Sequence, residues 1–370
     1  MGIKVGLVGL PNVGKSTLFN ALTKSSVPAE NYPFCTIDPH LAITEVPDPR
    51  IPQLIKVFNS KKEVPATISF VDIAGLVKGA ASGEGLGNQF LNHIREVDLI
   101  LHVLRCFTDP EITSDRTEAD PIDDYEIIVS ELMLKDLESV DKRLERMPRF
   151  IKAAKGNPLE EKELILENAL LEKVKVLLDK GDNQGVRKAI TTAEVKTVPL
   201  ISAKNFIIIA NIDEVEIEGD GFKKNPNYQK LIKVFGESNV IPICAKTEGE
   251  LSQLEESEAK EMMEMIGLKE TGLDKIIRQS YNELGLITFF TCGPQEIHAW
   301  PIPKGITIRK AAGEIHSDLE RGFIKADVYN VKDILEYPSE AKLKEIGKFR
   351  MEGQDYIVQD GDIIHIKFNV

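Results

Sequence analysis

Gly9-Leu10-Pro11-Asn12-Val13-Gly14-Lys15-Ser16 is the stretch that decides the fold of this 370-residue chain. It has the pattern G-x-x-x-x-G-K-S, with an apolar run at residues 3–8 before it and a helical pattern at residues 15–22 after it. In such a loop, backbone N–H groups surround phosphate oxygens, the lysine adds a positive charge, and the serine hydroxyl binds Mg²⁺. Because the pattern lies between a predicted strand and a predicted helix, it predicts the phosphate-binding loop (P-loop) of a nucleotide hydrolase.

Four more apolar runs predict further strands, at residues 66–71, 99–104, 206–210 and 240–244. Helical patterns separate these strands, which is typical of an α/β fold with a parallel sheet and helices on both faces. We therefore expect a P-loop NTPase domain of the G-domain type, formed by residues 1–130 and 200–283.

Two further segments have a different character. Leucines recur among dense charges from about residue 127 to residue 196, which predicts two antiparallel helices, a coiled-coil hairpin inserted at residues 131–199. Residues 284–370 predict a small α+β module with a tight turn at Asp360-Gly361. Within this module we expect strands at 287–292, 306–308, 322–328, 355–358 and 363–368 and a helix at 341–350.

The composition excludes several classes of protein. The net charge of −13 argues against a protein that covers nucleic acid with its whole surface. No apolar run reaches the roughly 18 residues of a membrane helix, so we expect a cytoplasmic protein without a membrane partner. The four cysteines form no C-x-x-C pair, so we expect reduced thiols rather than a zinc or redox site.

A second motif, Asp72-Ile73-Ala74-Gly75, follows the strand at 66–71. At this spacing from the P-loop, Asp72 is predicted to hold Mg²⁺ through water, and the Gly75 N–H to contact the γ-phosphate. Thr36, in the loop after the first helix, is predicted to bind Mg²⁺ and to sense the γ-phosphate. The predicted metal ligands are therefore Ser16, Thr36 and Asp72.

Base recognition is predicted at Asn211-Ile212-Asp213-Glu214, where GTPases carry N-K-x-D. Glu214 is one methylene longer than the aspartate that pairs with guanine, which favours tolerance of adenine or preference for it. Cys244-Ala245-Lys246 follows the next strand and is expected to lie beside the base. The predicted nucleotide contacts are Pro11, Asn12, Val13, Gly14, Lys15, Ser16, Thr17, Asn211, Ile212, Glu214, Cys244, Ala245 and Lys246.

Leu76 stands where Ras-like enzymes carry the glutamine that orients the attacking water. Another group must then assist hydrolysis, and Asn12 is one candidate, because it could hold a potassium ion beside the phosphates. The alternative is that Asn12 serves only the turn. The predicted catalytic set is Lys15, Asn12, Thr36 and Gly75.

Residues 142–155 contain six basic residues and one acidic residue, Glu145. One interpretation is an ordinary solvated helix face. The other is a surface that binds the ribosome or RNA.

Together these motifs resemble the YchF, or Obg-like ATPase, family of the TRAFAC class. The resemblance rests on Gly9–Ser16, residues 31–39 (N-Y-P-F-C-T-I-D-P), residues 72–87, the 211–214 tetrad, and residues 311–318 and 355–361. It covers essentially the whole chain and implies a G domain, a coiled-coil insertion and a C-terminal TGS (ubiquitin-like) domain.

The same resemblance implies slow, Mg²⁺-dependent hydrolysis of ATP, with GTP as a secondary substrate and K⁺ stimulation through Asn12. It implies a main-chain contact from Ile212 to adenine. It also implies a monomer that binds the ribosome, at the large subunit and its rRNA, and acts in translation or stress responses. Ser114 stands where many members carry a histidine proposed to help hydrolysis. Two alternatives stay open, namely a ribosome- or RNA-binding protein whose hydrolysis is incidental, and a guanine-selective GTPase.

Overall fold

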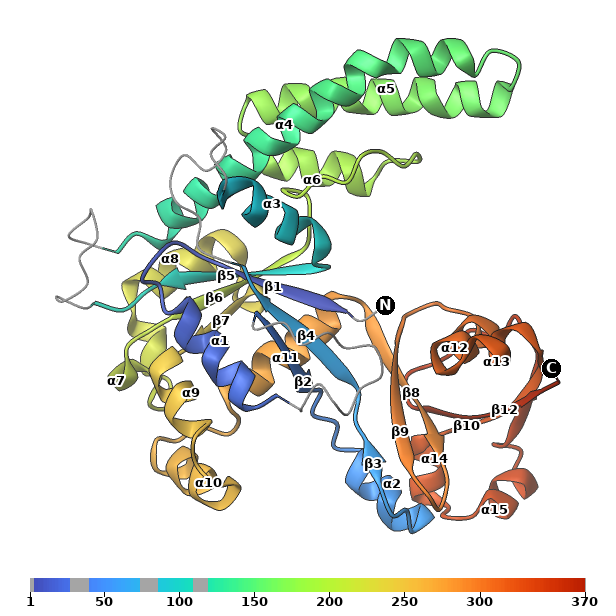
Figure 1. Ribbon diagram of the computed structural model, residues 1–370. Coiled ribbons are helices and arrows are strands. Elements are labelled where there is room, and N and C mark those ends of the chain that lie inside the picture. Colours follow the sequence, from blue (N-terminus) through green and yellow to red (C-terminus); the bar gives the residue numbers. More distant parts are fainter. Residues whose placement is uncertain (1–2, 27–39, 74–85, 109–118, 370) are drawn as a thin grey trace. The chain divides into compact units, whose positions relative to one another are not determined.

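The computed structural model describes residues 3–26, 40–73, 86–108 and 119–369 (Figure 1). Four residues singled out in the sequence, Thr36, Gly75, Leu76 and Ser114, lie outside the described residues. The chain divides into two compact units. Of the described residues, the first unit contains 3–25, 40–42, 70–73, 86–108 and 119–272, and the second contains 26, 43–69 and 273–369.

A six-stranded sheet with the order β2-β4-β1-β5-β6-β7 carries the P-loop. Its strands are β1 (Lys4–Val8), β2 (Leu41–Glu45), β4 (Thr67–Asp72), β5 (Leu99–Arg105), β6 (Phe206–Asn211) and β7 (Val240–Ile243). β1 pairs in parallel with β5, β5 with β6, and β6 with β7. The predicted α/β fold is therefore confirmed, and each predicted strand of this sheet begins and ends within one residue of the observed one.

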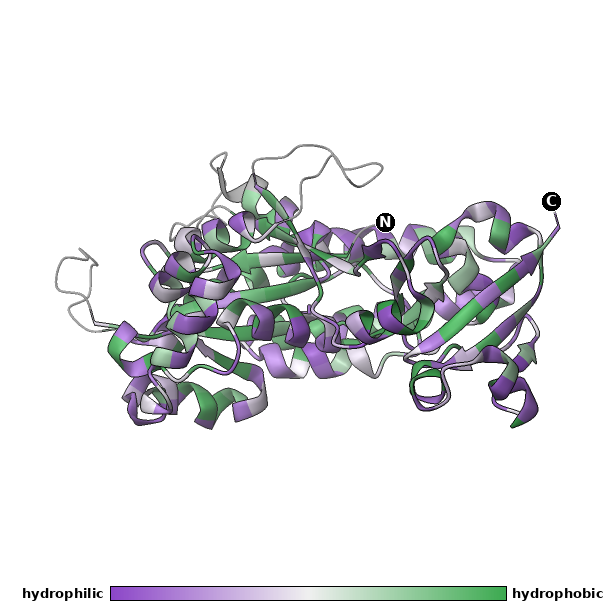
Figure 2. Ribbon diagram, turned by 90° about the horizontal axis from the view of Figure 1, so that it is seen from below, coloured by the Kyte–Doolittle hydropathy of each residue, from purple (hydrophilic) through white to green (hydrophobic). Residues whose placement is uncertain are grey.

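The helices of the first unit bury the apolar residues of this sheet. They include α1 (Lys15–Lys24), α3 (Leu86–Glu96), α7 (Glu214–Ile217), α8 (Pro226–Phe235), α9 (Ala245–Leu251) and α10 (Glu256–Met265). Ile94 of α3 packs in one cluster with Val8 and Ile100, and Leu231 of α8 packs in another with Leu104 and Ile208. Figure 2 shows the strands as mainly hydrophobic and the helices as hydrophilic on their outer sides.

The insertion contains three helices, whereas two were predicted. They are α4 (Pro121–Ala153), α5 (Pro158–Asp179) and α6 (Asn183–Thr191). α4 and α5 run side by side as a hairpin (Figure 1), with Val140 and Met147 of one packed with Leu171 and Val174 of the other. α4 begins before the recurring leucines because the Asp120 side chain caps it ahead of Pro121.

The second unit contains another six-stranded sheet, with the order β11-β10-β12-β8-β9-β3. Its strands are β3 (Glu63–Val64), β8 (Leu286–Cys292), β9 (Ile297–Pro303), β10 (Phe323–Asn330), β11 (Arg350–Glu352) and β12 (Asp362–Phe368). β12 runs antiparallel to β10 and parallel to β8. The helices of this unit are α2 (Ile51–Phe58), α12 (Ile308–Ile315), α13 (Ser317–Arg321), α14 (Val331–Glu336), α15 (Glu340–Glu345) and all but the first residue of α11 (Gly272–Glu283).

Three predictions for this unit were wrong. Neither 306–308 nor 355–358 forms a strand, because only a single antiparallel bridge joins Thr307 to Ile357, and α12 begins at Ile308. The helix predicted at 341–350 ends at Glu345, since Gly347 has a φ of 72° and the chain turns there. The turn predicted at Asp360-Gly361 is present, with Gly361 at a φ of 80°.

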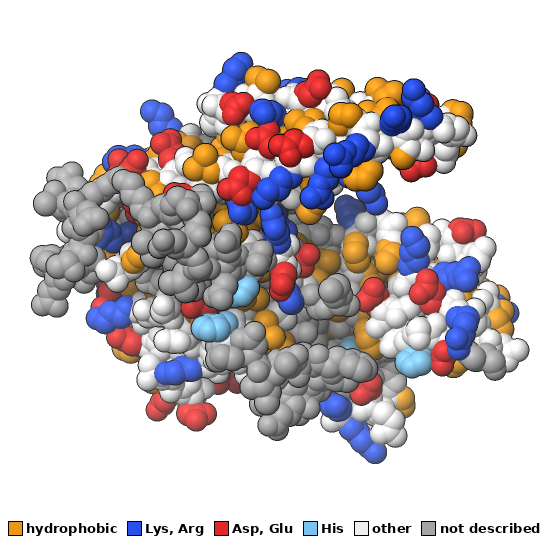
Figure 3. All heavy atoms as spheres, turned by 45° about the horizontal axis from the view of Figure 1, so that its top comes forward, with side chains coloured by type: hydrophobic (Ala, Val, Ile, Leu, Met, Phe, Trp, Pro, Cys, Tyr) orange, Lys and Arg blue, Asp and Glu red, His pale blue; other side chains and the backbone are white. Residues whose placement is uncertain are grey.

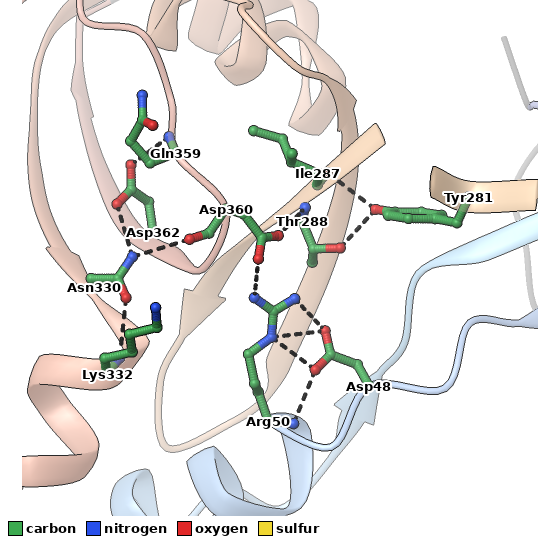
Figure 4. Close-up of polar contacts among 10 residues, drawn as sticks. All are labelled: Asp48, Arg50, Tyr281, Ile287, Thr288, Asn330, Lys332, Gln359, Asp360 and Asp362. Atoms are coloured by element: carbon green, nitrogen blue, oxygen red, sulfur yellow. Dashed lines mark hydrogen bonds and ion pairs between the residues drawn. The ribbon is translucent and has the colours of Figure 1, made fainter. Parts of the chain in front are cut away.

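Arg50 anchors residues 48–50 to the C-terminal sheet within the second unit (Figure 4). Its Nη2 lies 2.7 Å from Oδ2 of Asp48, and its Nη1 lies 2.7 Å from Oδ2 of Asp360. Asp360 in turn accepts a hydrogen bond from the backbone N–H of Thr288. The described part of residues 43–69, although predicted as G domain, therefore belongs to the compact unit of the C-terminal residues, and the boundaries at 131, 200 and 284 stay predictions.

Candidate nucleotide-binding site

The P-loop turns between β1 and α1 through positions that favour glycine or asparagine. Gly14 has a φ of 92° and Asn12 a φ of 65°, a region that most side chains avoid. A Cβ at Gly9 would lie 2.7 Å from the carbonyl oxygen of Val103, and a Cβ at Gly14 would collide with Nδ2 of Asn211. The loop therefore packs against β5 and β6, and it leads into the N-terminus of α1, where backbone N–H groups favour an anion.

Lys15 pairs with Asp72, which ends β4. The Nζ of Lys15 lies 2.5 Å from Oδ1 of Asp72, and the two side chains are only 9% and 16% exposed. The Asp72 N–H donates to the His40 carbonyl, and the next N–H, of Ile73, donates to the Leu7 carbonyl. Because the pair is shielded from water, its attraction is stronger than that of a surface pair. The structure thus brings together two of the residues that the sequence assigned to phosphate and metal.

Asn211 connects the P-loop to the first residue of α9, which follows β7. Its Nδ2 donates to the Val13 carbonyl at 2.9 Å, and its Oδ1 accepts from the Ala245 N–H at 2.9 Å. The side chain is buried, so both ends of its amide are committed to backbone groups. Cys244, just before Ala245, is buried as well. Asn211 is therefore a structural link between the phosphate side and the predicted base side of the site.

Glu214 and Lys246 lie at the two segments predicted to flank the base. Oε2 of Glu214, the first residue of α7, is 2.7 Å from Nζ of Lys246, the second residue of α9. The hydrogen bond from Lys246 to Glu214 raises the pKa of the lysine, so Lys246 keeps its positive charge at neutral pH. Ile212 is buried and its N–H donates to the Ile243 carbonyl. No sequence pattern indicated this ion pair, because its partners are 32 positions apart.

Pro11, Asn12 and Ser16 of the P-loop are exposed, as is Thr17, which follows it in α1. Asn12 has a conformation that asparagine tolerates better than most residues, which agrees with a role in the turn. Its side chain is also open to solvent, so a cation beside it stays a separate prediction.

Mg²⁺ is the metal that P-loop NTPase folds generally use, and the described residues fit it. The Ser16 hydroxyl is exposed at the start of α1, and Asp72 offers a carboxylate next to the Lys15 side chain. Hydroxyl and carboxylate oxygens are the hard ligands that Mg²⁺ prefers, and a few protein ligands suffice because phosphates and water complete the shell. Among the described residues no group of three or more His, Cys, Asp or Glu side chains could hold a metal by itself.

The basic residues of the hairpin divide into two kinds. Arg143 forms a two-point ion pair with Glu167, at 3.0 and 2.7 Å, and its guanidinium lies 4.7 Å from the Phe150 ring centre. Arg143 thus joins α4 to α5. The other basic residues are exposed, as the Lys and Arg side chains along the hairpin illustrate (Figure 3): Lys142, Arg146, Arg149, Lys152 and Lys155.

The remaining predictions on composition concern thiols and the membrane. In the described segments, the three cysteines Cys106, Cys244 and Cys292 are buried and free. Among the helices of the described part of the chain, none is both long and apolar enough to cross a membrane.

Two family profiles match separate parts of the chain. Residues 4–144 match a profile described as "50S ribosome-binding GTPase". Residues 286–369 match the profile YchF-GTPase_C, described as "Protein of unknown function (DUF933)".

Full-length relatives and a solved structure agree with these matches. The protein named "Ribosome-binding ATPase YchF" of Bacillus subtilis (strain 168) is 45% identical, and its counterpart of the same name in Escherichia coli O157:H7 is 44% identical. Both alignments cover 100% of each chain. The solved structure of the Schizosaccharomyces pombe YchF GTPase is 38% identical in sequence and superposes with a TM-score of 0.83. The match covers 99% of this chain and 98% of the Schizosaccharomyces pombe chain. Because relatives at this identity match the chain along its whole length and a YchF structure shares its fold, the chain belongs to the YchF family.

Proposed function

We propose that the chain is a ribosome-binding ATPase that holds its nucleotide in the P-loop and acts as a nucleotide-dependent switch in translation or stress responses. The observation that carries the proposal is the Asn211 link, because one buried side chain joins the phosphate loop to the start of α9, where the base is predicted to lie. The printed names of the Bacillus subtilis and Escherichia coli relatives support both the ATPase activity and the ribosome.

The phosphate end of the site supplies the charges. We propose that Lys15 binds the β- and γ-phosphates and that the nucleotide competes with Asp72 for this lysine, since the two side chains are in contact. Ser16 then binds Mg²⁺, Asp72 holds it through water, and Thr36 completes the ligands. Residues 11–17 enclose the phosphates, and the Gly75 N–H contacts the γ-phosphate. When bound, Mg²⁺ neutralises the developing negative charge.

The base end favours ATP over GTP. Ile212, Glu214, Cys244, Ala245 and Lys246 would surround the base. The Ile212 N–H already donates to the Ile243 carbonyl, so the main-chain contact of this residue to adenine would come from its carbonyl. A potassium ion beside Asn12, compensating for Leu76, is the finer proposal for how hydrolysis is assisted.

The ribosome would be bound, at the large subunit and its rRNA, through the exposed basic face of α4. A groove of about 610 Å³ lies beside this face and is lined in part by Leu144, Pro148 and Ile151 together with Lys152 and Lys155. Exposed cations next to apolar side chains suit RNA, because phosphates and base faces can both be contacted. A monomer in the cytoplasm is the state in which we expect this activity.

Lys15→Ala tests the proposal. We expect the wild type to release phosphate from ATP and to co-sediment with ribosomes in a way that depends on ATP, and Lys15→Ala to lose ATP binding and hydrolysis. Equal ribosome binding with and without ATP would instead support the passive binder whose hydrolysis is incidental. Phosphate release that survives Lys15→Ala would contradict the P-loop as the active site.

A further inference from the structure

The pair formed by Lys246 and Glu214 bridges the two segments beside the predicted base. Each residue is close to the Asn211 link, because Glu214 follows Asn211 by three positions and Lys246 follows Ala245 directly. The ion pair therefore joins the two segments predicted to flank the base, and the side chains of Lys246 and Glu214 are 67% and 45% exposed. It is reachable by a base and by solvent.

Guanine and adenine make different demands on a carboxylate at this place. Guanine presents two neighbouring donors, N1–H and N2–H, which both oxygens of one carboxylate can accept together. Adenine has no such pair of donors, because its N1 is an acceptor. A carboxylate with both oxygens free therefore stabilises guanine selectively.

We propose that Lys246 is a specificity-determining residue, which lowers the preference for guanine by occupying the Glu214 carboxylate. This inference rests on the proposed function, since it assumes that the base lies between these two segments. In the paired arrangement Oε2 of Glu214 accepts from the Lys246 ammonium. Guanine must then displace the lysine or use one oxygen, whereas adenine loses nothing by the pairing.

The expected size of the effect follows from the exposure of the pair. Exposed ion pairs of this kind contribute a free energy that corresponds to about 1.5- to 5-fold in an equilibrium constant. Lys246 therefore tunes the ratio of the two affinities rather than deciding between the bases outright. Loss of its positive charge also weakens the attraction for a triphosphate, but this acts on ATP and GTP equally and cancels in the ratio.

The test is a double-mutant cycle read as the ratio of the Kd for ATP to the Kd for GTP, both measured by calorimetry on the full chain. Lys246→Met keeps the apolar stem and removes the ammonium, and it should raise the ratio toward GTP by about 1.5- to 5-fold. In a Glu214→Gln background the same change should have no effect, because no carboxylate remains to be released. Lys246→Arg keeps a cation and should stay close to the wild type.

Lys260→Met provides the matched control. Lys260 forms a similarly exposed pair with Glu256 at 2.6 Å on α10, outside the predicted base site, so the ratio should not change. High salt should move the wild-type ratio toward that of Lys246→Met, while the ratio of Lys246→Met itself stays constant.

Two outcomes overturn the inference alone. One is that Lys246→Met leaves the ratio of the two Kd values unchanged. The other is that Lys246→Met changes this ratio as much in the Glu214→Gln background as in the wild type. If the wild type binds no ATP, or if binding survives Lys15→Ala, the proposed function fails and the inference fails with it.

Discussion

Asn211 donates a hydrogen bond from Nδ2 to the carbonyl oxygen of Val13 at 2.9 Å, across 198 positions of sequence. Its Oδ1 accepts from the Ala245 N–H, so a single amide holds backbone groups of the P-loop and of the first residue of α9. One buried side chain thus joins the P-loop to the start of α9, at the predicted base side of the site.

Asn211→Ala should destabilise the chain and weaken nucleotide binding together. The change leaves the Val13 carbonyl and the Ala245 N–H without their buried partner, at a cost of about 1–3 kcal/mol for each group. Thermal unfolding and calorimetric titration with ATP would measure both effects. Asn239→Ala is the control, since this exposed asparagine donates one hydrogen bond to the Phe235 carbonyl away from the loops. Normal ATP affinity in Asn211→Ala would contradict the link.

Gly14→Ala should abolish nucleotide binding, whereas Gly219→Ala should not. Both glycines have a positive φ, 92° and 57°, so both substitutions carry a similar backbone strain of about 1 kcal/mol. A Cβ at Gly14 also collides with Asn211 Nδ2, while a Cβ at Gly219 meets nothing within 4 Å. ATP titrations of the two variants isolate the collision from the strain. Equal affinities in both variants would show that the contact with Asn211 does not matter.

Asp72→Asn should have opposite effects with and without Mg²⁺. Removing the carboxylate frees Lys15 for phosphate, so ATP affinity in chelator should stay equal or increase. The gain in affinity or rate on adding Mg²⁺ should fall on the order of tenfold, as expected when a charged ligand partner is lost. Lys15→Ala, in contrast, should lose affinity under both conditions. A Mg²⁺ response of wild-type size in Asp72→Asn would exclude this residue from the metal site.

Two changes in the hairpin should separate stability from ribosome binding. Arg143→Glu places like charges beside the buried Glu167 and should destabilise α4 against α5, seen as a lower Tm. The double change Arg146→Glu and Arg149→Glu alters exposed positions and should leave the Tm nearly unchanged while weakening ribosome co-sedimentation in a salt-dependent way. Unaltered co-sedimentation of the double variant would leave this face as an ordinary solvated one.

Because of His102, the free energy of unfolding should decrease as the pH falls below 7. The side chain is buried on β5 against Tyr125 and Phe206, and burial, with a smaller effect of Arg187, lowers its pKa to about 3. Below the ordinary pKa of about 6.5 the unfolded chain binds a proton that the folded chain excludes, so unfolding becomes easier by about 1.4 kcal/mol per pH unit down to the folded pKa.

Denaturant unfolding from pH 7 to pH 5 checks this contribution. His102→Leu should lack this contribution, so its free energy of unfolding should depend less on pH than that of the wild type. Identical slopes for the wild type and His102→Leu would mean that His102 takes up its proton in the folded state.

The sequence predicted the nucleotide-binding half of the fold well because its signals are local. The buried strands β1, β5 and β6 are short apolar runs that end at turn or motif residues, and the P-loop marks the start of α1. β3 could not be predicted in this way, since its two residues form a strand only by pairing with Ile297 and His298 of β9. Likewise, Ile306 and Ile308 alternate as in a strand, but packing in the C-terminal core places Ile308 in a helix.

The sequence motifs pointed to residues of the candidate site but not to the hydrogen bonds and ion pairs between them. The tetrad at 211–214 identified Asn211 and Glu214, and the P-loop identified Lys15. The folded sheet brings their partners from separate elements, and no spacing rule connects them: Val13 lies in the P-loop, Ala245 and Lys246 begin α9, and Asp72 ends β4. Only the lysine partner of Glu214 changes the interpretation of the motif, because it shows that the carboxylate is already engaged.

A side-by-side calorimetric titration of the wild-type chain with ATP and GTP in the presence of Mg²⁺, repeated with Lys15→Ala, tests the proposed ATPase site most directly. We predict that ATP binds at least as tightly as GTP and that Lys15→Ala binds neither. GTP binding at least tenfold tighter than ATP would contradict the assignment and would make the chain a guanine-selective GTPase.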